Sequence, residues 1–289
     1  MADGPNPVVQ RRRLRAELRS ARQAAKLTQD SVAQAMDWSP SKIIRIEAGS
    51  TGISTNDLKA LLHLYKIDDP VRTDELLSLA RAAKERSWWS DFKDEVSPRF
   101  FQFIEHEAAA SGMQSFQPLM VPGLFQTRDY ARTVIAQFAP AASAERLDSL
   151  LNIRIRRQEV LNRANPNPPL IHLVLNEAAV RARVGSPEIM RRQLDYLIEL
   201  AARPNLTLEI IPFTAGVHPG MQAPFIILEL ADGADDDVLF LEQPRGDLIF
   251  ADDPDETSSY RETFEDLRKL SLGPEPSTAY LADIASGMS

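Results

Sequence analysis

Apolar and polar residues alternate at helical spacing near the start of the chain, and residues 28–49 are predicted to form two short helices joined by a tight turn. Thr28 and Ser39 each precede a helix and suit its N-cap, because a hydroxyl oxygen accepts a hydrogen bond from an otherwise unpaired backbone N–H. Both helices are predicted to pack one face against a shared core. The inward-facing residues are Val32, Ala33 and Met36, then Ile43 and Ile46.

The second of these helices, residues 39–48, has an apolar back and a polar front. Pro40 takes its first position, where a missing N–H costs nothing, and Gly49 suits its C-terminus. Arginine bridges O6 and N7 of guanine, serine meets either kind of base edge, and lysine favours phosphate. The helix is therefore predicted to enter the DNA major groove; an ordinary helical hairpin in a small core is the alternative. The residues on its front are Ser41, Lys42 and Arg45.

A resemblance to a known family follows from these residues. Thr28 with Gln29, the Ser39 cap and the run Ile43-x-x-Ile46-Glu47-x-Gly49 resemble the lambda-repressor-like helix-turn-helix of the XRE (xenobiotic response element) family. The resemblance implies an all-α domain of five helices at residues 8–86, with residues 39–48 as recognition helix. It implies phosphate contacts at two positions and base contacts at the recognition helix. The implied DNA-binding residues are Gln29, Ser39, Pro40, Ser41, Lys42 and Arg45.

The same resemblance implies a structural pair, with an arginine on the first helix bonded to the glutamate that ends the recognition helix. Arg22 and Glu47 occupy those places. Two positions depart from the family pattern. Asp37 replaces the common turn glycine, which is a mild change because Asp tolerates positive φ. Ile44 replaces a small polar residue, and its side chain either meets a thymine methyl group or packs against the domain.

Charge is distributed unevenly along the 289 residues, whose net charge is −8. Residues 1–66 carry 11 Lys and Arg against 6 Asp and Glu, a local charge of +5, and the remainder carries 22 against 35, a charge of −13. Local field governs the approach to phosphate, so a basic head on an acidic body fits a DNA reader. The predicted first helix, residues 8–25, adds arginines that either contact phosphate or form a solvated face: Arg11, Arg12, Arg13, Arg15 and Arg19.

Composition limits the remaining chemistry. The absence of cysteine excludes disulfides, thiolate zinc sites and a cysteine nucleophile. Neither an apolar signal region nor a membrane-length apolar stretch occurs, so a cytoplasmic protein is expected. Glu105, His106 and Glu107 are adjacent on a predicted helix, where neighbouring side chains diverge by about 100° and do not converge on one metal ion. No metal or cofactor is expected.

Trp88 and Trp89 mark the predicted boundary to a second domain, residues 87–289. They either anchor the first domain on the second through buried aromatic area or line a ligand pocket. Helices and strands then alternate irregularly, which predicts an α+β fold with a mixed sheet of about five strands. The predicted strands are residues 170–175, 206–213, 224–230, 238–242 and 247–250. The predicted helices are residues 98–112, 127–138, 144–164, 177–183, 186–200 and 254–272, with a tail from Gly273.

This second domain resembles one that follows the same helix-turn-helix in many actinomycete regulators. The matching pieces include Trp88-Trp89, residues 103–108, residues 121–131, residues 154–161 and residues 211–216. The regulators it resembles are described as toxin–antitoxin-like, with a small partner protein encoded nearby. We expect the partner or ligand region to include Trp88, Trp89, Glu105 and Gln126.

Three functions remain open at this point. The first is a dimeric, sequence-specific transcriptional regulator that binds double-stranded DNA, with a second domain that binds a partner protein or effector. The second is an antitoxin-like protein that sequesters a small partner and binds DNA for autoregulation. The third, an enzyme tethered to DNA, is disfavoured because the chain lacks a GxSxG elbow, a phosphate loop, a dinucleotide fingerprint and an HExxH motif.

Overall fold

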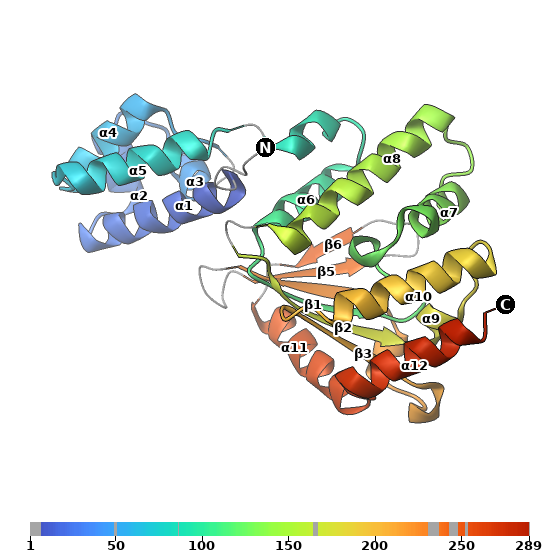
Figure 1. The fold of residues 1–289 in the computed structure, drawn as a ribbon. Coiled ribbons are helices and arrows are strands. Elements are labelled where there is room, and N and C mark those ends of the chain that lie inside the picture. The colour runs from blue at the N-terminus through green and yellow to red at the C-terminus, as the bar shows by residue number, and fades with distance from the viewer. Residues whose placement is uncertain are drawn as a thin grey trace. The chain divides into compact units, whose positions relative to one another are not determined.

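The computed structural model describes residues 7–48, 51–85, 87–163, 167–230, 237–242, 248–251 and 254–288. The chain forms two units, Met1–Ser90 and Asp91–Ser289. The described part of the first unit contains five α-helices (Figure 1), as predicted. They are α1 (Pro7–Ala24), α2 (Gln29–Ala35), α3 (Pro40–Ala48), α4 (Thr55–Leu64) and α5 (Pro70–Ala82).

One apolar core joins these five helices. Each of them contributes fully or nearly fully buried aliphatic side chains, and burying one such side chain stabilises the fold by about 1.5–3 kcal/mol. A buried polar network supplements this small core, as described below. The main core residues are Leu14, Leu18, Val32, Ala33, Ile43, Ile46, Leu58, Leu61, Leu62, Leu76, Leu77 and Ala80.

Left-handed residues end three of the helices. Lys26, Asp37 and Lys66 have φ angles of 58°, 53° and 61°, so the predicted positive φ of Asp37 is confirmed. At each end, the next backbone N–H returns to the carbonyl five residues earlier, which is the Schellman pattern. The residue that donates this bond is apolar and packs on the core in all three cases: Leu27, Trp38 and Ile67.

A six-stranded mixed sheet with strand order β3-β2-β1-β4-β5-β6 forms the centre of the second unit. β1, β2 and β3 are parallel, and β4, β5 and β6 continue antiparallel from β1. The α+β class is therefore confirmed, with one strand more than the sequence suggested. The strands are β1 (Gly112–Gln117), β2 (Leu170–Asn176), β3 (Leu206–Ile211), β4 (Phe225–Glu229), β5 (Val238–Glu242) and β6 (Leu248–Ala251).

Helices cover both faces of this sheet. α6, α8 and α10 lie on one side of it and α11 on the other (Figure 1), while α12 packs beside α10 and along β3. The α11 face is aromatic, with Phe264 buried against Phe225 and Val174. The helices are α6 (Pro98–Ala109), α7 (Arg128–Phe138), α8 (Ala144–Arg157), α9 (Glu177–Arg181), α10 (Pro187–Ala201), α11 (Pro254–Lys269) and α12 (Pro274–Ser286).

Two predicted elements were wrong. The helix expected to reach residue 112 ends at Ala109, and β1 begins three residues later in the middle of the sheet. The expected tail after Gly273 is the helix α12, whose buried Ser277 accepts a hydrogen bond of 2.8 Å from the backbone N–H of Ile210. The predicted role of Gly49 in ending α3 lies outside the described residues. Within the described residues, no helix combines the length and apolar character needed to cross a membrane.

Candidate nucleic-acid interface

The helix α3 is amphipathic, and its two faces have different roles. Ile43, Ile46 and Glu47 are buried in the core, whereas the side chains opposite them are exposed. The exposed stripe follows the spacing i, i+3, i+4, i+7, which places four side chains in a row on one helix surface. The stripe consists of Ser41, Ile44, Arg45 and Ala48, preceded by the exposed Ser39 and Pro40 at the start of the helix.

Glu47 fixes α3 against the rest of the unit. Arg22 forms a bidentate ion pair with its carboxylate, with Nε–Oε1 at 2.7 Å and Nη2–Oε2 at 3.0 Å. Gln29 Nε2 donates to the same carboxylate at 2.8 Å. The hydrogen bond from Arg22 to Glu47 raises the pKa of the Arg22 guanidinium above its ordinary value. The predicted pair of Arg22 and Glu47 is therefore present, and it links α1 and α2 to the helix that carries the exposed stripe.

Gln29 thus has a structural contact that the sequence did not suggest. One of the two N–H bonds of its amide group is engaged with Glu47, so the second one and the backbone N–H groups at the start of α2 remain to donate to a phosphate. Tyr65 lies beside the same network, and burial, followed by the Glu47 charge, raises the pKa of its hydroxyl. The Oη atom of Tyr65 is buried without a hydrogen-bond partner among the described residues.

Lys42 does not belong to the exposed stripe. Its ammonium lies 3.1 Å from the Asp57 carboxylate on α4 and 3.9 Å from the centre of the Trp38 ring. The predicted front of Ser41, Lys42 and Arg45 therefore changes, with Ile44 in the row and Lys42 at its side. No local pattern predicts this contact, because Asp57 is 15 residues from Lys42 and belongs to another helix.

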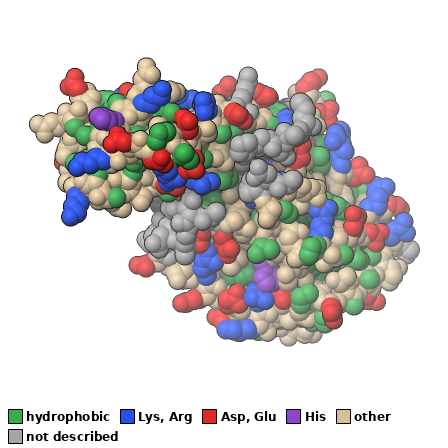
Figure 2. Space-filling view, turned by 60° about the vertical axis from the view of Figure 1, so that its left-hand side comes forward, with side chains coloured by type: hydrophobic (Ala, Val, Ile, Leu, Met, Phe, Trp, Pro, Cys, Tyr) green, Lys and Arg blue, Asp and Glu red, His purple; other side chains and the backbone are tan. Residues whose placement is uncertain are grey.

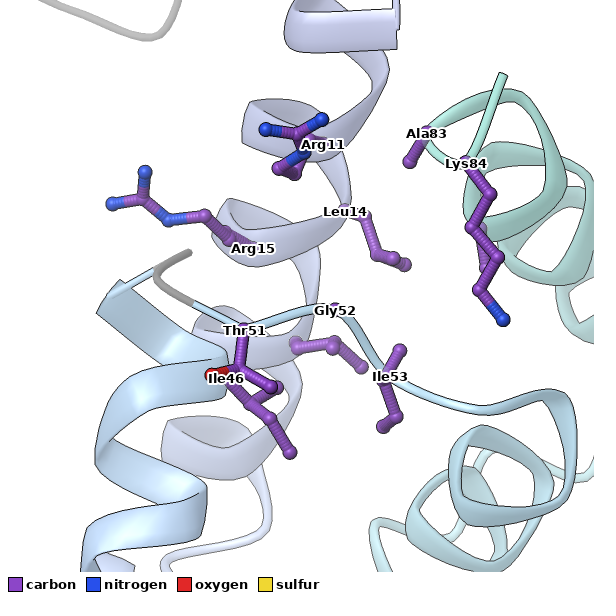
Figure 3. A pocket seen from close by; sticks show the side chains of 11 residues that line it. Arg11, Leu14, Arg15, Ile46, Thr51, Gly52, Ile53, Ala83 and Lys84 are labelled. Carbon is purple, nitrogen blue, oxygen red and sulfur yellow. The ribbon is translucent and has the colours of Figure 1, made fainter. Parts of the chain in front are cut away.

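Arginines of α1 lie next to the C-terminal end of α3. Arg15 Nε donates to the Glu47 carbonyl at 3.1 Å, which places a cation where the helix dipole is negative. Arg11 and Arg15 extend to the same side of a small pocket bordered by Thr51 (Figure 3). Its cavity volume is about 40 Å³. Ligand sites usually measure about 300–1,000 Å³, so this pocket is too small for a metabolite.

Charge on the surface is mixed. Figure 2 shows Lys and Arg side chains interspersed with Asp and Glu over the visible face of both units. The positive excess of residues 1–66 is therefore not gathered into one patch on that face. The first unit presents single cations on defined helices, and Arg45 is the cation in the exposed stripe.

Gln126 has a structural place in the second unit. It is buried, its Nε2 donates to the Val121 carbonyl at 2.7 Å, and its Oε1 accepts from Arg154 at 2.7 Å. Gln158 donates to its backbone carbonyl at 2.6 Å. Both polar ends of its side chain are engaged within the unit, so the predicted ligand role of Gln126 does not fit its surroundings. A Cβ at Gly123 would lie 3.2 Å from Arg154 Nε, so the glycine leaves room for the arginine.

A buried ion pair lies next to this segment. Arg157 bonds both oxygens of Glu107, at 2.8 and 2.7 Å, and its guanidinium lies over the rings of Phe100 and Phe103. Burial, and after it the nearby Arg157 charge, lowers the pKa of Arg154 to about 10. The pair of Arg157 and Glu107 joins α8 to α6, and neither residue belongs to the expected ligand region.

The other residues of the expected ligand region are Trp88, Trp89 and Glu105. Trp89 is buried and Trp88 half-buried, with their rings edge to face and 5.6 Å between centroids. Glu105 is half-buried on α6, while its neighbour Glu107 points to Arg157. Trp88 and Trp89 belong to the first unit, and Glu105 and Gln126 belong to the second. Within the described residues, no group of three His, Asp or Glu side chains could hold a metal ion.

The loop between β3 and β4 presents apolar side chains. Phe213, Val217 and Met221 are 57%, 93% and 54% exposed. Beneath them, Asn176 Nδ2 donates to Nε2 of the buried His218 at 3.1 Å, and Gly220 lies against the Phe116 ring, where a Cβ would approach to 2.5 Å. The loop therefore crosses the ends of β2 and β1, with a packed underside and an apolar outer surface.

The short capped helices and the exposed stripe of α3 define the first unit as a helix-turn-helix domain. Residues 13–76 match the family model described as a helix-turn-helix domain. Residues 100–283 match the model described as Domain of unknown function (DUF5753), and the chain belongs to that family. No curated protein and no solved structure matches the chain.

Proposed function

We propose that this protein is a sequence-specific transcriptional regulator of the XRE type, with α3 in the major groove of double-stranded DNA. The observation that carries the proposal is the exposed row of Ser41, Ile44 and Arg45 on a helix whose other face is fixed by the buried Glu47 network. Because its buried face is fixed, α3 presents its exposed side chains in one orientation. Hydrogen bonding to base edges requires such fixed side-chain positions.

Selection from a random double-stranded DNA library with the full chain tests the proposal. We expect one enriched sequence, and an Arg45→Ala variant that loses about 1–3 kcal/mol of discrimination at one guanine position. Arg81→Ala, which removes an exposed charge from α5 of the same unit, is the matched control and should keep the preference. Binding without any enriched sequence would refute the proposal.

We further propose that the second unit binds a partner protein or effector and that the protein acts as a homodimer reading two half-sites about one helical turn apart. The exposed Phe213, Val217 and Met221 support a protein contact, because neighbouring exposed apolar side chains often mark such surfaces. An antitoxin-like role is the alternative, with DNA binding serving autoregulation.

Purification from the native host separates these two roles. A stoichiometric small protein that abolishes DNA binding favours sequestration, whereas a complex that still binds the selected site favours regulation. Val217→Asp should weaken the complex without changing the melting temperature, because this side chain is 93% exposed. Sedimentation of the free protein and of its complex with the selected DNA gives the oligomeric state. A monomer bound to that DNA would refute the dimer.

A further inference from the structure

Ile44 stands out in the exposed row of α3. It is 48% exposed, whereas the neighbouring Ile43 and Ile46 are 0% and 3% exposed. Single exposed apolar residues are common on protein surfaces, so exposure alone carries little weight. The position of Ile44 is what matters, because it lies between Ser41 and Arg45 on the face that the proposed function assigns to DNA.

The neighbouring cation is directed elsewhere. The Lys42 ammonium lies 3.1 Å from the Asp57 carboxylate and 3.9 Å from the centre of the Trp38 ring, at the side of the row. The central side chains of the row are consequently Ser41, Ile44 and Arg45. Serine and arginine have hydrogen-bonding partners on base edges, and an aliphatic side chain has none.

The major groove offers one apolar group to such a side chain, the C5-methyl group of thymine. We infer that Ile44 is a specificity-determining residue that recognises the C5-methyl group of a pyrimidine close to the base read by Arg45. This inference rests on the proposed function of α3 and adds to it the chemical class of a second recognised base. A 5-methylcytosine carries the same methyl group and belongs to the same class.

Replacing thymine by deoxyuridine tests the inference, because it removes one methyl group and leaves the hydrogen-bonding edge unchanged. Each thymine of the selected site is replaced in turn, and the affinities of the full-length wild type and of Ile44→Ala are measured. At one position per half-site, deoxyuridine should weaken the wild type about fourfold, the effect of losing one buried methyl contact. The same replacement should leave Ile44→Ala unaffected, and Ile44→Val should retain most of the sensitivity.

Each outcome has a separate meaning. No enriched sequence in the selection would refute the proposed function together with this inference. An enriched site that lacks thymine, a wild type insensitive to every deoxyuridine, or an Ile44→Ala variant as sensitive as the wild type would overturn this inference alone. Thermal unfolding of Ile44→Ala is the folding control, and an exposed side chain predicts an unchanged melting temperature.

Discussion

The two units of the protein each contain a buried glutamate in bidentate contact with an arginine, and they use the pair differently. In the first unit, Arg22 and Gln29 hold Glu47, which belongs to the same short helix as the exposed Ser41 and Arg45. In the second unit, Arg157 and Glu107 join two helices. The first pair orients the solvent-exposed face of α3, and the second holds α6 against α8 inside the second unit.

The comparison shows that the role of a buried ion pair depends on which other side chains the paired helices present. Such a pair contributes modestly to net stability, since desolvation offsets most of the attraction, but losing one partner leaves an isolated buried charge. Loss of the first pair should therefore impair DNA recognition as well as stability. Loss of the second should destabilise its own unit and leave α3 intact.

The largest expected effect is that of Glu107→Ala. It leaves the Arg157 guanidinium, whose side chain is 7% exposed, without its carboxylate, and should cost about 3–5 kcal/mol in the second unit. Hydrogen exchange resolved by peptide measures the effect, with loss of protection in α6 and α8. Replacing both partners by apolar residues, Glu107→Met with Arg157→Leu, should recover most of the stability. Equal loss of protection in α3 would contradict the separation of the two roles.

Arg22→Ala should destabilise the first unit by about 3 kcal/mol, at the lower end of the same range, because the Arg22 side chain keeps 13% exposure and Gln29 remains bonded to Glu47. Chemical denaturation with hydrogen exchange on α3 measures the change. Arg72→Ala is the control, since Arg72 pairs with Glu17 and Glu75 near the surface and should cost less than about 1 kcal/mol. Similar losses of stability for the two variants would show that the pair of Arg22 and Glu47 contributes no more than a surface ion pair.

Acidification should lower the stability of the second unit more than that of the first, and this effect should be smaller than those of the two substitutions above. Burial lowers the pKa of both His172 and His218 in the second unit, whereas His63 in the first is exposed. The folded state disfavours the protonated imidazoles, so their stability contribution is present above the unfolded pKa of 6.5 and is lost as the pH falls below it. The loss approaches about 1.4 kcal/mol per pH unit for each histidine.

Denaturation between about pH 7.5 and pH 5.5 measures this dependence, about one unit either side of the ordinary histidine pKa. The variant His172→Gln with His218→Gln should flatten the curve of the second unit, and His63→Gln should change neither unit. A wild-type curve that stays parallel to that of the double variant would show that these imidazoles do not control the response.

The smallest expected effect concerns the left-handed helix ends of the first unit. Lys66→Gly should stabilise this unit by about 0.5–1 kcal/mol, because the left-handed conformation costs an ordinary residue about 1–2 kcal/mol and the flexibility of glycine cancels part of the gain. Lys66→Ala removes the same side chain but keeps the strain and should give no gain. Thermal unfolding compares the two variants, and equal melting temperatures would show that φ is not the cause.

Much of the first unit could be predicted from its sequence because its signals are local. The Thr28 cap is confirmed, with its hydroxyl accepting from Ser31 N at 3.1 Å. The contact between Lys42 and Asp57 could not be predicted, since the position of α4 relative to α3 depends on the packed core. Ile44 remained ambiguous for the same reason, because only the folded unit shows that it does not pack.

The second unit was less predictable because its strands do not follow a simple pattern. β1 reads Gly-Met-Gln-Ser-Phe-Gln, without β-branched residues, and its buried polar side chains hide a central strand. The start of α12, Pro274 to Pro276, resembles a tail by composition. The buried place of Gln126 could not be predicted, because two of the residues that bond it, Arg154 and Gln158, lie 28 and 32 residues further along the chain.

The loop across the ends of the parallel strands limits where this protein can receive a small molecule. In open sheets of this kind, ligands usually settle outside the carboxyl ends of the strands. Here Gly220 and His218 already occupy that place, pressed against Phe116 and Asn176. A small molecule that bound at this edge of the sheet would have to displace the loop that carries His218 and Gly220. Its binding would therefore also move the exposed apolar side chain of Val217 on the outer surface of the same loop.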